Sequence, residues 1–484
     1  MSATLRTPPT VRWNRMRHGA SSDTPTMREP NIGASRCQPM PAPLRSHAAH
    51  RHEVVLGTSD RSLVASRAAR ARGWLTAANG AMYDAIVIGA RCAGAATAML
   101  LARKGCEVLL VDRASFPSEI PHGHFIHRDG PRRLADWRLL DRVLATNCPA
   151  VTSTITDMGD FPLAADGLEV DGVPLGLGPR RSRLDRVLVE AAVEAGAELR
   201  EGFAVEDFIA EGGAIRGVHA RAAAAGTSLR ERAAVVIGAD GRNSALARRV
   251  AAPVVERAPT LTCWYFSYWS GVRSRGLELY LRDRRVIFAF PTNDGLHAIF
   301  VGAPIDELRA ARADIEGHIL ATIDLVPELA ERVRAGRRAE RLLGATQLPN
   351  FIRRPYGAGW ALVGDAGCHK DPFLALGICD ALRDAELLAE AVDEGLSGRM
   401  AMETALAYFE RVRNDATTPD FRRNLEMARL EPKPPPAEQY PLRAALRGND
   451  ADTRQYYLAI QGMVDPDPFF DPSNLERIVR AGAP

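Results

Sequence analysis

Apolar and polar positions alternate in a regular way once the chain has passed residue 82. Residues 85–88 form a short apolar run, which is typical of a strand buried on both faces of a parallel sheet. Gly89 follows this run, residues 95–104 are rich in helix formers, and Gly105 stands where a helix C-cap is expected. Residues 107–111 predict a second strand that ends at Asp112. The pattern therefore predicts a strand–turn–helix–strand unit.

Two later segments repeat the exit from an apolar strand into an acidic, glycine-containing loop. Residues 233–239 run into Asp240 and Gly241, and residues 360–363 run into Gly364 and Asp365, followed by a predicted helix over 380–392. An open α/β sheet binds ligands at the carboxyl ends of its strands, although a single such exit is also an ordinary turn. Further elements are predicted as a helix over 184–195 and strands over 198–205 and 214–222.

A separate group of strands is predicted between residues 256 and 344. Alternation and the turn at 293–295 indicate an antiparallel sheet, with strands over 261–268, 277–281, 286–290 and 297–301. Helical segments are expected over 304–335 and beyond residue 400.

The first turn has the spacing of a dinucleotide-binding motif. Gly89 and Gly94 stand at its outer glycine positions, and Asp112 lies 23 positions after Gly89, near the offset of an acid that binds a ribose hydroxyl. Arg91 occupies the middle position, where glycine is usual. Its side chain either offers charge to the pyrophosphate or points to solvent while the turn widens. A βαβ packing turn without ligand is the alternative interpretation.

With these three segments in this order, the chain resembles the para-hydroxybenzoate hydroxylase-like flavoproteins. These are the group A flavoprotein monooxygenases, with their geranylgeranyl reductase and halogenase relatives. The resemblance covers residue 82 to about residue 400 and implies FAD as cofactor. It implies cofactor-binding roles for Gly89, Arg91, Gly94, Asp112, Arg113, Arg181, Asp240, Gly241, Gly364, Asp365, Gly377 and Ile378.

The third segment departs from the family pattern. Cys368 takes the place of a histidine, His369 comes one position later, Leu374 replaces a glycine and Cys379 replaces an asparagine. Pro372 is retained and is named, with His369, as a catalytic candidate, because an imidazole near neutral pKa beside the flavin can deprotonate a phenol. His369, Lys370 and Asp371 either line the pocket or are solvated loop residues.

Aromatic residues cluster on the first strand of the antiparallel group. Alternation places Trp264, Phe266 and Tyr268 on one face and Tyr265 and Trp269 on the other. The first three, with Phe290, are the candidate substrate residues, and packing within a core sheet is the alternative for each.

The resemblance implies an NAD(P)H-dependent monooxygenase that hydroxylates an apolar or aromatic small molecule with molecular oxygen, through a flavin C4a-hydroperoxide. NADH or NADPH would be the co-substrate. The alternatives are an FAD-dependent alkene reductase of the prenyl type, towards which the run 288–291 points, and a non-catalytic flavin-binding or regulatory protein.

Composition adds limits. The seven cysteines have irregular spacing without a Cys-x-x-Cys pair, which favours a reduced, cytoplasmic protein, and no metal site is expected. Apolar runs stay below the ~18 residues of a membrane span. The formal net charge of +3 hides an asymmetry, because residues 1–81 hold 12 arginines and 4 acids. This stretch is predicted to be a disordered extension from a non-native or upstream start, with organellar targeting as the alternative and no nucleic acid expected as partner.

The predicted fold is therefore α/β. A Rossmann-type FAD-binding domain is expected from residues 82–150, 180–255 and 345–400, with an inserted antiparallel-sheet substrate domain from 151–179 and 256–344, and C-terminal helices over 401–484.

Overall fold

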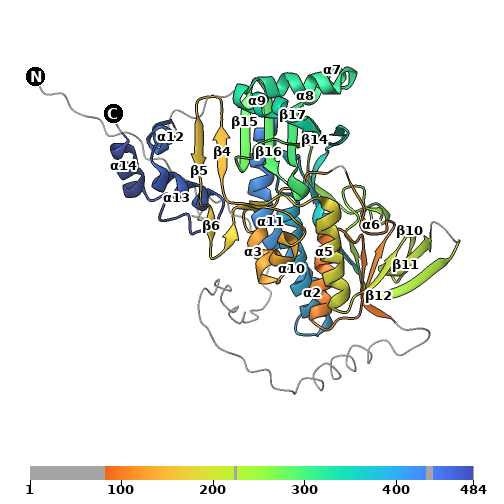
Figure 1. Ribbon diagram of the computed structural model, residues 1–484. Helices are drawn as coiled ribbons and strands as arrows, with labels where there is room; N and C mark the ends of the chain where they lie inside the picture. The colour runs from red at the N-terminus through yellow and green to blue at the C-terminus, as the bar shows by residue number, and fades with distance from the viewer. Residues whose placement is uncertain (1–81, 121, 223–225, 432–439, 483–484) are drawn as a thin grey trace, which may run out of the picture. The chain divides into compact units, whose positions relative to one another are not determined.

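The computed structural model describes residues 82–120, 122–222, 226–431 and 440–482 (Figure 1). The predicted Arg-rich extension, residues 1–81, lies outside the described residues.

A parallel sheet forms around the first predicted strand. β1 pairs in parallel with β2 on one side and with β12 on the other, β2 pairs with β9, and β12 pairs with β22. The strand order in the sheet is thus β9-β2-β1-β12-β22, with the reversal of order at β1, as in a Rossmann-type fold. The strands are β1 (Tyr83–Ile88), β2 (Val108–Asp112), β9 (Glu198–Glu201), β12 (Ser228–Gly238) and β22 (Trp360–Leu362).

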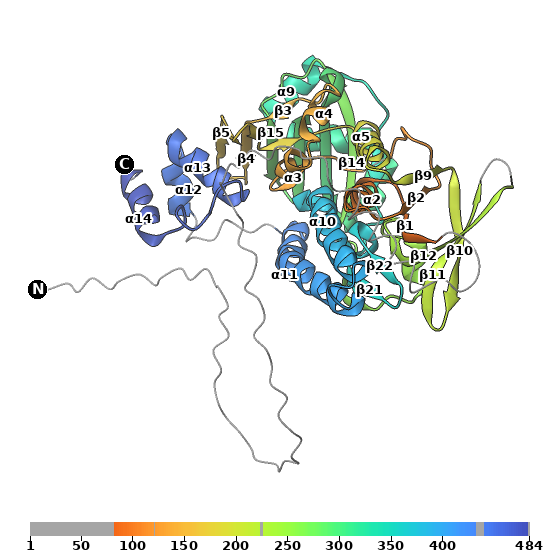
Figure 2. The same ribbon diagram turned by 90° about the horizontal axis from the view of Figure 1, so that it is seen from below.

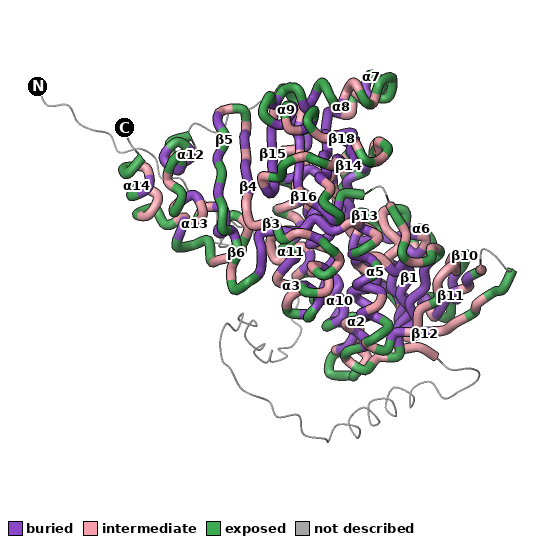
Figure 3. Tube along the Cα trace, viewed as in Figure 1, coloured by how far each residue is buried: buried purple, intermediate pink, exposed green. Residues whose placement is uncertain are grey.

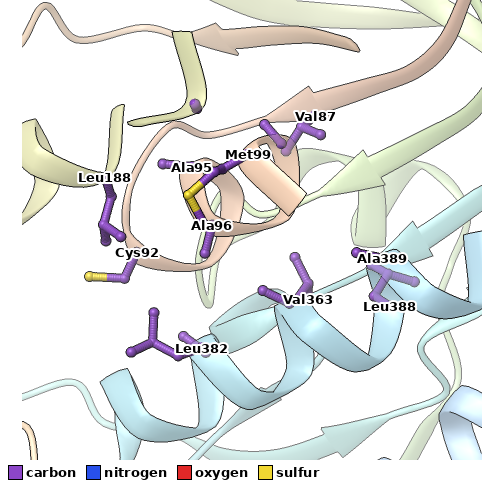
Figure 4. Close-up of a cluster of buried hydrophobic side chains, with 14 of the residues drawn as sticks. Val87, Cys92, Ala95, Ala96, Met99, Leu188, Val363, Leu382, Leu388 and Ala389 are labelled. Carbon is purple, nitrogen blue, oxygen red and sulfur yellow. The ribbon is translucent and has the colours of Figure 1, made fainter. Parts of the chain in front are cut away.

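Three helices pack together beside this sheet, because the middle one carries small side chains. α2 (Cys92–Arg103) is mostly alanine on its buried positions, and it lies between α5 (Arg181–Glu194) and α10 (Gly377–Leu396). Figure 4 shows Ala95, Ala96 and Met99 of α2 among side chains from α5 and α10. α11 (Met402–Ala428) packs on the outer side of α10.

The sheet is extended by an antiparallel pair, β10 (Phe203–Glu211) and β11 (Ala214–Ala222), which follows β12 (Figure 2). The prediction of one strand over 198–205 is wrong. Gly202 adopts a left-handed backbone with φ +75°, which ends β9, and β10 then pairs with β11 rather than continuing the parallel edge.

The second large sheet confirms the predicted antiparallel group. Its order is β18-β14-β17-β16-β15-β4-β5, with β19 on β14, and all pairs are antiparallel except β15 with β4. The strands are β4 (Thr154–Asp157), β5 (Pro162–Ala165), β14 (Thr262–Ser270), β15 (Leu277–Arg282), β16 (Arg285–Pro291), β17 (His297–Pro304), β18 (Arg337–Arg338) and β19 (Leu343–Ala345). Helices α7 (Leu308–Ala313), α8 (Ile315–Asp324) and α9 (Pro327–Ala335) lie along one side of it (Figure 1), and α8 and α9 bury apolar side chains against that face.

The C-terminal helices α12 (Tyr440–Leu446), α13 (Asp450–Ile460) and α14 (Pro472–Ala481) share an apolar cluster with β5 and the segment after it. The fold class predicted from the sequence is thus confirmed, and Figure 3 shows that buried backbone concentrates in the two large sheets and the helices against them. The remaining elements are α3 (Gly130–Asp136), α4 (Leu140–Leu144), α6 (Ala245–Arg249), β3 (Ala150–Val151), β6 (Glu169–Val170), β7 (Val173–Pro174), β8 (Gly176–Leu177), β13 (Val254–Ala258), β20 (Asn350–Arg353), β21 (Tyr356–Gly357) and β23 (Cys368–His369). Within the described residues, every helix is too short or too polar to cross a lipid bilayer.

Candidate cofactor and active site

The three loops singled out in the sequence leave the parallel sheet side by side. Backbone hydrogen bonds join them at the strand ends: Gly89 N–H donates to the Val111 carbonyl (2.7 Å), and Ala239 N–H donates to the Ile88 carbonyl (2.8 Å). Val363 N–H donates to the Gly238 carbonyl (3.0 Å), which brings in the third loop. The carboxyl ends of β2, β1, β12 and β22 therefore form one continuous edge.

The glycines at this edge leave bare backbone where the loops meet. Gly89 has φ +100°, and a Cβ on Gly94 would lie 1.7 Å from the Gly89 carbonyl oxygen. A Cβ on Gly364 would lie 2.7 Å from the Cβ of Ala93, so the third loop packs directly on the start of α2. No side chain larger than hydrogen fits at Gly94 or Gly364 without moving backbone or a neighbouring helix.

Asp112 holds the first turn in shape. Its carboxylate accepts hydrogen bonds from the N–H groups of Ala90 and Ala114, each at 2.7 Å. The side chain is buried, whereas Arg113 is exposed. Each carboxylate oxygen keeps a further lone pair, so that Asp112 can still accept from a ligand hydroxyl.

Arg91 turns towards α5 rather than towards open solvent. Its guanidinium donates to Asp185 (2.8 Å) and to the Ser118 hydroxyl (2.8 Å), and lies over the Phe116 ring at 5.5 Å. Arg181 donates to the same Asp185 at 2.9 Å. Two arginines thus share one fully buried carboxylate, which leaves net positive charge beside the first turn.

Asp185 was not selected by sequence reasoning. The available signal was its i,i+4 spacing from Arg181 on a helix, but that spacing is common among surface ion pairs. Its partner Arg91, 94 positions earlier, follows only from the packing of α2 on α5.

The second loop presents an oxygen atom without a partner. Asp240 accepts from Ala245 N–H through Oδ2 (2.6 Å), while its buried Oδ1 has no hydrogen-bond partner among the described residues. Burial raises the pKa of Asp240 above its ordinary value, an effect opposed by its hydrogen bonds at the start of α6. Gly241 follows with φ +79°.

The third loop ends in an open helix N-terminus. Gly364 and the half-buried Asp365 form a 3-10 turn, and the chain continues through a second 3-10 turn, Pro372–Leu374, to α10. α10 begins at the exposed Gly377, where a Cβ would meet no other atom within 4 Å, and no side chain caps it; Ile378 is buried. The first N–H groups of α10 therefore face space available to a ligand.

The two candidate catalytic residues occupy different surroundings. Pro372 opens the turn that leads to α10. His369 lies in β23, where its Nδ1–H donates to the Pro349 carbonyl and its ring stacks on Phe351. The contacts described for the His369 ring belong to this small sheet of β13, β20 and β23, and not to the first two loops.

β14 divides its aromatic residues between two faces, as the alternation predicts. Tyr265 and Trp269 pack against α8 and α9, whereas Trp264, Phe266 and Tyr268 belong to a second cluster with Phe290. Phe266 and Phe290 both stack on Phe300, with ring centroids 4.3 and 5.6 Å apart. We call these five residues, Trp264, Phe266, Tyr268, Phe290 and Phe300, the aromatic wall; Phe373 of the Pro372–Leu374 turn joins the same cluster.

One hydrogen-bonded pair in this wall was not foreseen. The buried His124 donates from Nδ1 to the Gly178 carbonyl (3.2 Å), so its Nε2 accepts from the Tyr268 hydroxyl (3.0 Å). Burial, and then Arg180 and Arg181, lower the pKa of His124 to about 3, which keeps the ring neutral. Arg180 lies 4.0 Å from the Tyr268 ring centroid and pairs with Glu340 (2.6 Å).

Among the residues that the structure describes, no group of three or more His, Cys, Asp or Glu side chains is arranged to hold a metal ion.

Comparison with known families identifies most of the described chain. A family model described as an FAD binding domain matches residues 82–418.

Curated relatives share a quarter to a third of the aligned residues. Digeranylgeranylglycerophospholipid reductase of Methanosarcina mazei is 25% identical over 326 residues, which cover 65% of this chain and 76% of that protein. Protein FixC of Salmonella typhi is 31% identical over 238 residues, which cover 47% of this chain and half of FixC.

Solved structures share the fold at lower identity. The myxobacterial chondrochloren halogenase CndH, an FAD-dependent halogenase, superposes with a TM-score of 0.66 at 20% identity, covering 83% of this chain and 97% of CndH. PqsL of Pseudomonas aeruginosa in complex with 2-aminobenzoylacetate gives a TM-score of 0.61 at 23% identity, covering 78% of this chain and 99% of PqsL.

Proposed function

The chain belongs to the FAD binding domain family, whose members here include FAD-dependent oxidoreductases, and on that premise we propose that it is an NAD(P)H-dependent monooxygenase acting on an apolar or aromatic small molecule. The supporting observation is the aromatic wall, which faces inward on β14, β16 and β17 and is joined by Phe373 from the third loop.

The described residues fit FAD on two counts. The absence of Cβ atoms at Gly89 and Gly94 leaves the backbone of the first turn open to a pyrophosphate next to the start of α2. The buried, unpartnered Oδ1 of Asp240 provides a place for a ribose or ribitol hydroxyl to donate a hydrogen bond.

We assign the cofactor contacts loop by loop. The pyrophosphate would lie against the first turn and the positive charge of Arg91 and Arg181, and the adenosine ribose against Asp112. The other proposed contacts are Arg113, Asp240 and Gly241, with Gly364 and Asp365 at the ribitol and Gly377 and Ile378 at the isoalloxazine. When bound, FAD supplies the transfer of electrons from NADH or NADPH to oxygen.

The chain's own residues then shape the reaction site. Trp264, Phe266 and Phe290 would exclude water, while Tyr268 offers one neutral hydrogen-bonding group, held by His124. We keep His369 and Pro372 as proposed catalytic residues on the third loop. The neutral wall favours a substrate without charge at the part of the molecule that contacts it.

Spectroscopy of the purified protein tests this proposal. We expect a yellow protein whose visible absorption is bleached by NADPH or NADH without oxygen and restored by air, and oxygen consumption that rises with a suitable aromatic substrate. A protein that cannot be reconstituted with FAD would overturn the assignment of the cofactor site.

An alkene reductase of the prenyl type is the second candidate. The curated relatives named digeranylgeranylglycerophospholipid reductase favour it, as does the run Phe288 to Pro291 on β16. A reductase would consume NAD(P)H and a polyprenyl substrate without oxygen, so turnover under anaerobic conditions decides between the two. Tight FAD binding with no turnover of either kind would instead indicate a flavin-binding protein without catalysis.

A further inference from the structure

We propose that Asp371 is a positioning residue that ties the loop before α10 to the aromatic wall by holding Thr262 and, through it, Trp264. The effect on flavin rests on the proposed function, because that loop is assigned there to the isoalloxazine. The link itself rests only on contacts within the chain.

A short chain of buried hydrogen bonds forms the link. Asp371 Oδ2 accepts from the Thr262 hydroxyl at 2.5 Å, and Thr262 Oγ1 accepts from Trp264 Nε1–H at 2.7 Å. The exposed fractions of the three residues are 1%, 0% and 3%. Thr262 and Trp264 begin β14, 109 positions before Asp371 in the case of Thr262.

The other groups of Asp371 fix the loop. Its Oδ1 accepts from Phe373 N–H (3.1 Å), which caps the 3-10 turn that starts at Pro372. Its own N–H donates to Asn350 Oδ1 (2.6 Å), and its carbonyl accepts from Asn424 Nδ2 (2.8 Å). Asn424 also accepts from Leu374 N–H (3.0 Å), so α11 supports the same turn.

The direction of these bonds requires an acceptor at position 371. The indole N–H of Trp264 can only donate, so Thr262 must accept from it and direct its own hydroxyl hydrogen to another group. Asp371 accepts from both Thr262 and Phe373. Asparagine offers one oxygen and one NH₂ group, so it loses one of the two bonds in either orientation.

A change at Thr262 should therefore reach the flavin through Asp371. Thr262→Val keeps the shape of the side chain but removes the hydroxyl, and Thr262→Ser keeps the hydroxyl and serves as the matched control. Asp371→Asn breaks the same link from the other side.

The test measures the visible absorption spectrum of bound FAD and its Kd in the full chain for the wild type, these three variants and the double variant Thr262→Val/Asp371→Asn. We expect Thr262→Val and Asp371→Asn to shift the flavin spectrum and to raise the Kd about tenfold, the size of one lost hydrogen bond to a charged group. Thr262→Ser should match the wild type, and the double variant should show no more than the larger single effect.

A wild-type flavin spectrum in Thr262→Val, or additive effects in the double variant, would overturn the proposal. Urea unfolding midpoints of the same variants without FAD provide a second readout that is independent of the cofactor. If the wild type binds no FAD, the proposed function fails, while non-additive midpoints would still support the link and additive midpoints would refute it.

Discussion

At the scale of single residues, Asp185 connects the first turn to α5. One fully buried carboxylate accepts from Arg91 and Arg181, and the Cys92 thiol donates to it at 3.3 Å. Removing it would leave the buried Arg181 without this partner, and a buried charge that loses its partner is costly.

Asp185→Ala is expected to lower the free energy of unfolding by about 3 kcal/mol and to weaken FAD binding, because Arg91 and Arg181 lose their common anchor. Urea unfolding and fluorescence titration with FAD measure the two effects. The control on the same helix is Glu190→Gln, whose partner Arg186 lies at the surface (2.7 Å); it should change stability by about 0.5 kcal/mol or less. Equal effects of the two substitutions would contradict the assigned role.

Asp371 gives the chain a stability that depends on pH. Burial raises its pKa to about 6 from an ordinary value of 3.8, although Thr262 and Phe373 act in the opposite direction. The folded state therefore keeps a proton that the unfolded chain has lost between about pH 4 and pH 6, so this contribution is complete at low pH and is lost as the pH rises through 6.

We expect the stability of the wild type relative to Asp371→Asn to fall on the order of 3 kcal/mol between pH 4 and pH 7. Urea unfolding of both proteins at a series of pH values measures this difference. The difference should be flat above pH 7, and a difference that instead grows with pH would show that the carboxyl titrates below its ordinary range.

At the scale of elements, α2 depends on close contact with its neighbours. Its small residues let α5 and α10 approach from two sides, and Gly94 brings the helix against the first turn. Larger side chains on α2 would push apart elements that also carry the cofactor contacts.

Gly94→Ala should therefore lower stability by about 3 kcal/mol or more and abolish FAD binding, because its Cβ would lie 1.7 Å from the Gly89 carbonyl oxygen. Calorimetry and the flavin absorption of the purified protein report the two effects. Gly123→Ala is the control, since a Cβ there meets no atom within 4 Å and φ is not in the left-handed region; it should retain both properties.

Local patterns predicted the elements that depend on local sequence. The first βαβ unit, the four strands of the second sheet and the two faces of β14 follow from apolar runs, glycine positions and alternation. The break at Gly202 was missed, because an apolar and polar pattern does not reveal a residue with positive φ between two strands.

Contacts between distant segments could not be read in the same way. The partners of Asp185, His124 and Asp371 lie 94, 144 and 109 positions away, and each pair meets only because two elements pack. The three histidines after residue 121 were noted in the sequence, yet only the fold shows that His124 contacts Tyr268.

At the scale of the whole molecule, neither large sheet is built from one continuous part of the chain. β22 completes the parallel sheet more than 120 residues after β12, and β4 and β5 join the second sheet from before α5. The edge that carries the candidate cofactor contacts is therefore assembled from segments before, between and after the strands of the second sheet.

This arrangement has a consequence during synthesis on the ribosome. α10, which covers one side of α2, begins 274 residues after α2 ends. At about 5–20 residues per second, roughly 14–55 s pass between the translation of the two helices. Throughout that interval the nascent chain exposes the alanine-rich face of α2, so the early product is a substrate for chaperones and cannot retain its cofactor until translation is nearly complete.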